Sequence, residues 1–132
     1  MDRFRHRTPL ARAAGLGSAR SGFSHWWTER ITAVALVPLT LWFAGSLIAR
    51  SRSDHEAFLS WLATPVSSVL MILLLIALFW HMALGLQVII EDYVHSGAKY
   101  WALLAVRFIC STLAAIGILA MLRITLTAWA SA

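Results

Sequence analysis

The chain has 132 residues, of which 60% are hydrophobic and only 13% are charged, and its formal net charge is +5. A water-soluble fold of this length could not bury so much apolar surface, so the composition excludes an ordinary soluble domain. The positive charge alone would also suit nucleic-acid binding, but beside this apolar content membrane topology and anionic lipid explain it better. We therefore expect membrane lipid around the chain and no nucleic-acid partner.

Residues 1–22 carry no sustained apolar period, and we expect them to form a basic cytoplasmic N-terminal arm. The cations before the first apolar run are six of the eleven Lys and Arg residues, namely Arg3, Arg5, Arg7, Arg12, Arg20 and Arg30. Such an excess predicts a cytoplasmic N-terminus. The arm lacks the apolar core and small-residue cleavage site of a secretory signal, and we expect a bacterial inner-membrane protein rather than a mitochondrial one.

Three apolar runs follow, and each is close to the roughly 20 residues that cross about 30 Å of hydrocarbon. We place the transmembrane helices at about 31–49, 66–90 and 100–124. The first should be bent by Pro38, and the second should begin at the helix-start signal Thr64-Pro65.

The connections between these runs suggest how the spans are arranged. The loop before Pro65 ends in apolar and aromatic residues that suit a short interfacial helix on the outer side. The short loop 91–99 makes the second and third spans antiparallel neighbours, with the C-terminus on the periplasmic side. The predicted fold class is all-α integral membrane: residues 23–132 form a three-helix anchor domain that is part of a heteromeric helix bundle.

His81 is the strongest candidate for a functional residue, because ionisable groups inside the hydrocarbon region are costly and usually functional. A neutral imidazole is the usual axial ligand of a membrane haem iron. Ala77 and Gly85 share its helical stripe one turn away on either side, which leaves space for a flat macrocycle. The alternative is that His81 makes an interhelical hydrogen bond while the two small residues allow close packing.

Two further positions are candidates for binding. Asp92 and Tyr93 lie about 16 to 18 Å from His81 along the helix, nearer the cytoplasmic face. The phenol could donate a hydrogen bond to a quinone carbonyl, with the carboxylate orienting it or relaying a proton, or the pair could be an ordinary interfacial anchor. Arg107 is placed near the depth of His81, where it either pairs with a haem propionate or extends to the interface.

The segment from His81 to Tyr93, His-Met-Ala-Leu-Gly-Leu-Gln-Val-Ile-Ile-Glu-Asp-Tyr, resembles the haem-ligand and quinone segment of the small anchor subunit of succinate dehydrogenase, respiratory complex II. The stretch His25-Trp-Trp-Thr-Glu-Arg-Ile-Thr-Ala33 resembles the entry segment of its bacterial members. The similarity extends over roughly residues 24–125 and includes the number, order and lengths of the helices.

The resemblance implies that His81 is one axial ligand of a haem b shared with the second membrane anchor, the cytochrome b subunit. It also implies that Tyr93, with Asp92 beside it, lines a ubiquinone pocket near the iron-sulfur subunit. The flavoprotein subunit would complete the complex, and this chain would catalyse nothing alone, because it has no dinucleotide fingerprint and no cysteine set for a cluster.

Other interpretations of the chain remain open. One is the anchor of a fumarate reductase, and another is a haem-free structural membrane subunit. The single cysteine, Cys110, is expected to be a small buried hydrophobic residue.

Overall fold

The computed structural model describes residues 20–131, and within that range it is all-helical. The helices are α2 (Arg20–Ala49), α3 (His55–Leu62), α4 (Pro65–Tyr93) and α5 (Ala98–Ala130). Of these, α2, α4 and α5 are long and apolar enough to cross a membrane. The prediction of an all-α fold with three transmembrane helices is confirmed, whereas most of the predicted arm, residues 1–19, lies outside the described residues.

Each long helix contains its predicted span and continues beyond it. The largest difference is at α2, which begins at residue 20, whereas the predicted span begins at residue 31. Hydropathy marks only the part of a helix that suits hydrocarbon, but a helix satisfies its backbone hydrogen bonds internally and can continue through the headgroup layer. The ends of the apolar runs therefore underestimate the ends of the helices.

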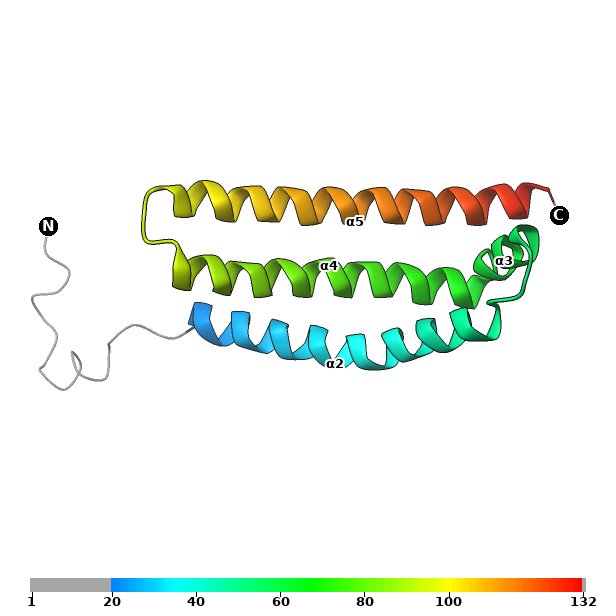
Figure 1. The fold of residues 1–132 in the computed structure, drawn as a ribbon, viewed down its shortest axis with the longest axis horizontal. Helices are drawn as coiled ribbons and strands as arrows, with labels where there is room; N and C mark the ends of the chain where they lie inside the picture. Colours follow the sequence, from blue (N-terminus) through cyan, green and yellow to red (C-terminus); the bar gives the residue numbers. More distant parts are fainter. Residues whose placement is uncertain (1–19, 132) are drawn as a thin grey trace, which may run out of the picture.

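The three long helices lie side by side in one layer, with α4 between α2 and α5 (Figure 1). Among the described residues, α4 packs against both neighbours, whereas α2 and α5 do not pack against each other. The predicted antiparallel pairing of the second and third spans is confirmed. A single layer has no enclosed interior, and none of the large side chains in residues 20–131 is fully buried.

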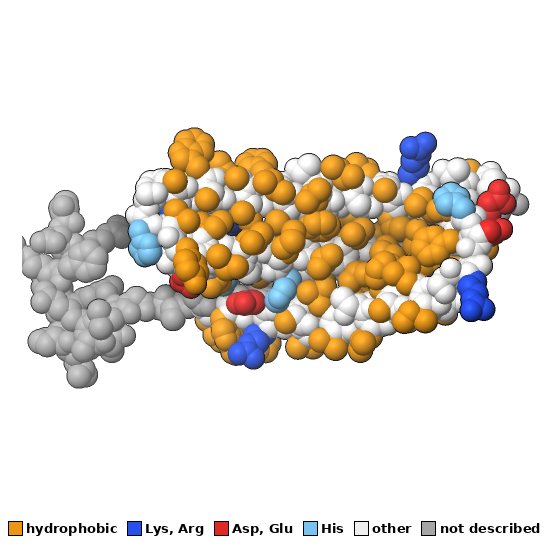
Figure 2. All heavy atoms as spheres, viewed as in Figure 1, with side chains coloured by type: hydrophobic (Ala, Val, Ile, Leu, Met, Phe, Trp, Pro, Cys, Tyr) orange, Lys and Arg blue, Asp and Glu red, His pale blue; other side chains and the backbone are white. Residues whose placement is uncertain are grey.

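The face of this layer that Figure 2 shows is apolar along most of its length. Hydrophobic side chains cover the middle, and most Lys, Arg, Asp and Glu side chains gather toward the two ends of the long axis. This distribution is the one that a bilayer requires, because charged groups are stable only near its aqueous surfaces.

Local features explain the shape of the first two helices. α2 is bowed in Figure 1, and Pro38, which cannot donate a backbone hydrogen bond, lies inside it. α3 is the short helix expected before Pro65, and the Asp54 side chain caps it by accepting a hydrogen bond from the Ala57 backbone N–H at 2.9 Å. The ring of Trp61 on α3 is tilted against the ring of Trp42 on α2, with centroids 5.9 Å apart.

Polar and steric contacts join the first half of α4 to the second half of α5. The buried hydroxyls of Ser68 and Thr125 are 2.8 Å apart, and Ser68 also donates to the Leu62 carbonyl at 3.0 Å. At Gly117 an added Cβ would lie 3.1 Å from Cδ1 of Leu75, so this glycine allows close approach of the two helices. Cys110 is buried and free, as expected.

Candidate functional site around His81

His81 lies near the middle of α4 and faces α2. Its side chain is half-buried, and its Nδ1 lies 3.0 Å from Oγ1 of Thr32 on α2. Within residues 20–131 the imidazole makes its hydrogen bond through this nitrogen, and Nε2 makes none. The interhelical hydrogen bond considered as an alternative from the sequence therefore exists, but it uses only one of the two ring nitrogens.

Gly85, one turn from His81 on α4, borders open space. A Cβ added at Gly85 would meet nothing within 4 Å, in contrast to the tight contact at Gly117. Gly85 is therefore not used for close helix packing within the described chain. Its position one turn from His81 leaves room beside the imidazole for a flat group contributed from outside the three helices.

Asp92 and Tyr93 lie at the C-terminal end of α4, before the short connection to α5. Both side chains are exposed, and Tyr93 is 82% accessible. In the described residues neither side chain makes a hydrogen bond. The phenol and the carboxylate are therefore free to interact with groups that approach this end of the helices.

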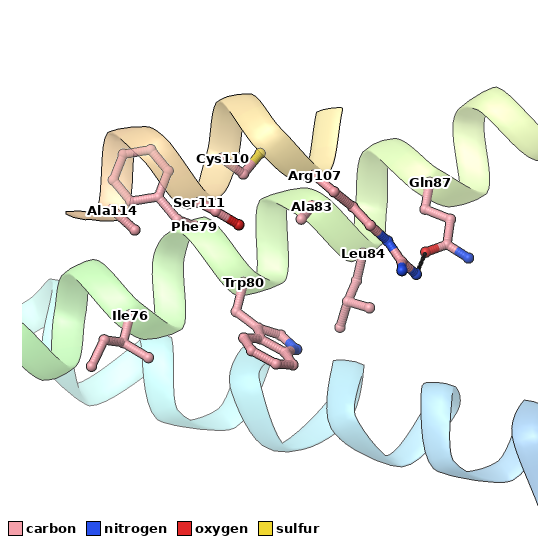
Figure 3. A pocket seen from close by; sticks show the side chains of 10 residues that line it. All are labelled: Ile76, Phe79, Trp80, Ala83, Leu84, Gln87, Arg107, Cys110, Ser111 and Ala114. Carbon is pink, nitrogen blue, oxygen red and sulfur yellow. Dashed lines mark hydrogen bonds between the residues drawn. The ribbon is translucent and has the colours of Figure 1, made fainter. Parts of the chain in front are cut away.

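A cavity of about 350 Å³ lies between α4 and α5 and is mainly apolar (Figure 3). Arg107 and Gln87 bring polar groups to it, and the guanidinium donates a hydrogen bond to Gln87 Oε1 at 3.1 Å. Gln87 in turn donates through Nε2 to Glu91 Oε1 at 2.8 Å. Gln87 thus links the cation of α5 to an acid near the end of α4, which explains how Arg107 is accommodated on an apolar helix.

The predicted site residues do not form one cluster. His81 faces α2, Arg107 belongs to α5, and the Asp92-Tyr93 pair lies at the C-terminal end of α4. Leu84 lines the cavity and is three residues from His81, so the edge of the cavity lies about 60° around α4 from the imidazole.

The entry segment of α2 contains another histidine that the structure leaves without a partner. The Nε2 atom of His25 is buried and has no hydrogen-bond partner among the described residues. Nearby, the Arg30 guanidinium lies over the Trp26 ring, 5.1 Å from its centroid. A buried polar nitrogen without a partner is costly, so a group beyond residues 20–131 is expected to complete the environment of His25.

Two kinds of similarity relate the chain to known proteins. The family model described as the succinate dehydrogenase/fumarate reductase transmembrane subunit matches residues 5–114, which include all of α2, α3 and α4 and half of α5. The chain belongs to this family. The resemblance inferred from the segment between His81 and Tyr93 is therefore confirmed at the level of the family.

The relatives of this transmembrane subunit include two named succinate dehydrogenase hydrophobic membrane anchor subunit. The one from Rickettsia bellii is 36% identical over 88 residues, which cover 67% of this chain and 70% of the relative. The one from Paracoccus denitrificans is 31% identical over 100 residues, which cover 76% of this chain and 78% of the relative. No solved structure matches the chain significantly.

Sequence reasoning about this subunit missed two side chains that the structure brings into the argument, Thr32 and Gln87. Thr32 belongs to the entry segment, yet its distance of 49 residues from His81 carries no spacing signal. Gln87 lies within the segment from His81 to Tyr93, where a glutamine in an apolar helix would have been the available signal.

Proposed function

We propose that this subunit anchors a succinate:ubiquinone oxidoreductase in the bacterial inner membrane, supplies one axial ligand to a haem b, and forms part of the ubiquinone site. The observation that carries the proposal is the half-buried His81 in the middle of a membrane-spanning helix, with Nε2 unengaged and open space at Gly85. Membership of the succinate dehydrogenase/fumarate reductase family supports it. The relatives described above carry the succinate dehydrogenase name, which favours this direction over fumarate reductase.

The residues present fit a haem. His81 would hold the iron through Nε2, while its other nitrogen is already occupied by Thr32. Within residues 20–131 no three His, Cys, Asp or Glu side chains come together, which suits a single axial ligand rather than a metal centre enclosed by this chain. When bound, the haem supplies one-electron chemistry, and the protein tunes it through the axial ligand and the hydrogen bonds behind that ligand.

The partners follow from what this chain lacks and from its shape. A flat layer of three helices has apolar faces that another membrane chain can cover, and a six-coordinate haem needs a second axial ligand. Both requirements are met by a second anchor, the cytochrome b subunit. The chain has one cysteine, so the clusters belong to an iron-sulfur subunit, and it has no dinucleotide fingerprint, so the flavin belongs to a flavoprotein subunit.

The quinone site is proposed at the end of α4. The Tyr93 phenol can donate a hydrogen bond to a quinone carbonyl, and Asp92 can orient that phenol or relay a proton to the reduced ring. The exposure of both side chains leaves them accessible to quinone and to an iron-sulfur partner docked at this end. This end also carries the start of α2, so the proposed cytoplasmic N-terminus and the quinone site lie on the same side of the membrane, with the C-terminus in the periplasm.

Arg107 is proposed as a ligand for a haem propionate. One of its nitrogens donates to Gln87, and the remaining N–H groups of the guanidinium fork are suited to a carboxylate. This role requires the macrocycle to extend from His81 toward the α5 side of α4, past Leu84 at the edge of the cavity.

The decisive experiment replaces His81 in the assembled complex. His81→Ala should abolish the reduced b-type absorption band and lower the haem-to-protein ratio to background, because His81 is the only histidine in the predicted spans 31–49, 66–90 and 100–124. His55→Ala is the matched control. His55 is exposed at the start of α3, at the end of the layer that lies away from the C-terminal end of α4. A His81→Ala complex with the wild-type band and haem content would refute the proposal and leave a haem-free structural subunit.

A further inference from the structure

Thr32 is the only described residue within hydrogen-bond distance of an imidazole nitrogen of His81, and its own hydroxyl has three such partners. Oγ1 of Thr32 lies 2.9 Å from the Thr28 carbonyl oxygen, 3.0 Å from the Glu29 carbonyl oxygen and 3.0 Å from His81 Nδ1. The two carbonyls belong to the preceding turn of the same helix. The hydroxyl therefore connects the backbone of α2 to the side chain of α4.

The hydroxyl has one proton to share among these neighbours. A carbonyl oxygen can only accept, whereas a neutral imidazole nitrogen either donates or accepts. When the Thr32 proton points to the two carbonyls, only its lone pairs face His81, and Nδ1 must then carry the hydrogen. The opposite arrangement would place the imidazole proton on Nε2 and close that nitrogen to a metal.

The other threonines of α2 show which arrangement the helix favours. Thr40 Oγ1 donates to the Leu36 carbonyl at 2.6 Å and lies 3.1 Å from the Val37 carbonyl, although no histidine is near it. Thr28 Oγ1 donates to the Ser24 carbonyl at 2.8 Å. Each threonine of α2 therefore donates a hydrogen bond from its hydroxyl to a carbonyl of the preceding turn, and this bond does not depend on His81.

We propose that Thr32 is a positioning residue that holds His81 in the tautomer with its proton on Nδ1, so that the lone pair of Nε2 is directed at the haem iron. This inference rests on the proposed function, because it takes His81 as the axial ligand. The hydrogen bond also restrains rotation of the ring. When the hydroxyl oxygen of Thr32 accepts a hydrogen bond from Nδ1–H, the imidazole becomes a stronger electron donor to the iron.

The test removes the hydroxyl while keeping the shape of the side chain. Thr32→Val in the full complex should lower haem affinity about tenfold or more, since the groups behind a ligand contribute at this level. In the complexes that retain haem, His81 without the Thr32 hydroxyl is a weaker electron donor to the iron. This change should favour ferrous over ferric iron by up to about tenfold, which is a rise in midpoint potential of up to about 59 mV for one electron. Thr32→Ser keeps a hydroxyl and should restore both properties.

Thr40→Val is the matched control, because it removes the same kind of backbone bond from the same helix without a histidine partner. It should leave the haem content, the midpoint potential and the electron paramagnetic resonance signature of the ligand unchanged. Assembly of every variant is checked by co-purification of this subunit with the flavoprotein and iron-sulfur subunits, which does not depend on the membrane haem.

Several results would overturn the inference. One is a Thr32→Val complex with wild-type potential and haem content, and another is a Thr32→Ser complex that behaves like Thr32→Val. If Thr32→Val and the smaller Thr32→Ala both fail to assemble while Thr40→Val assembles, Thr32 serves helix packing and the inference is wrong. These results would not affect the proposal that His81 ligates the haem. Retention of haem by His81→Ala would instead refute the proposed function itself.

Discussion

The open space at Gly85 allows a perturbation that should act on the haem and not on the subunit. A Cβ added at this position meets nothing within 4 Å among the described residues, so a larger side chain at residue 85 starts in space that the three helices leave open. Glycine is also about 0.8 to 1.0 kcal/mol less favourable than alanine inside a helix, so replacing it does not weaken α4. A loss of haem in this variant would therefore report on a group that occupies the space from outside.

The expected size of the effect follows from overpacking. Extra side-chain volume forced into an occupied space costs about 1 to 3 kcal/mol, and each 1.4 kcal/mol is a factor of ten in affinity. Gly85→Leu should thus weaken haem binding about 5- to 150-fold, measured as the haem-to-protein ratio and the reduced absorption band of the purified complex. The loss of haem affinity in Gly85→Ala should lie at or below the lower end of this range.

Two other glycines provide controls for this measurement. Gly45 on α2 also has no neighbour within 4 Å of an added Cβ, and Gly45→Leu should leave haem content unchanged. Gly117→Leu should instead disturb the contact of α5 with Leu75 and lower the thermal stability of the complex. If Gly85→Leu assembles with wild-type haem content, no macrocycle lies against Gly85, and the placement beside His81 is wrong.

Two further predictions concern the helix end and the α4–α5 contact. Tyr93→Phe should lower the rate of quinone reduction up to about tenfold, the value of one hydrogen bond, while succinate oxidation by a soluble acceptor stays largely intact; equal loss of both rates would rule out a local quinone role. For the buried hydroxyl pair of Ser68 and Thr125, a double-mutant cycle with Ser68→Ala and Thr125→Val on the unfolding of the complex in detergent should give a coupling of about 0.6 kcal/mol, at most about 1.7. A coupling indistinguishable from zero would show that the two hydroxyls do not stabilise each other.

Much of the architecture could be predicted because the bilayer acts on each segment separately. A run of about 20 apolar residues is a span wherever its neighbours lie, so the number and order of the three helices followed from hydropathy alone. The start of α4 at Pro65 and the short helix before it were also local signals. His81 was found for the same reason, since an ionisable residue within a span is conspicuous without any knowledge of contacts.

The sequence by itself therefore determined what crosses the membrane and which residues are chemically unusual there. Only the tertiary structure decided which helices touch: α4 between α2 and α5, Thr32 opposite His81, and Gln87 beside Arg107. It also distinguished Gly85, which borders open space, from Gly117, against which the Leu75 side chain packs, although both are glycines in apolar helices. The physical reason is that such contacts depend on how whole helices rotate and pack against each other, and residues 20 or 49 positions apart leave no periodic trace of that packing in the sequence.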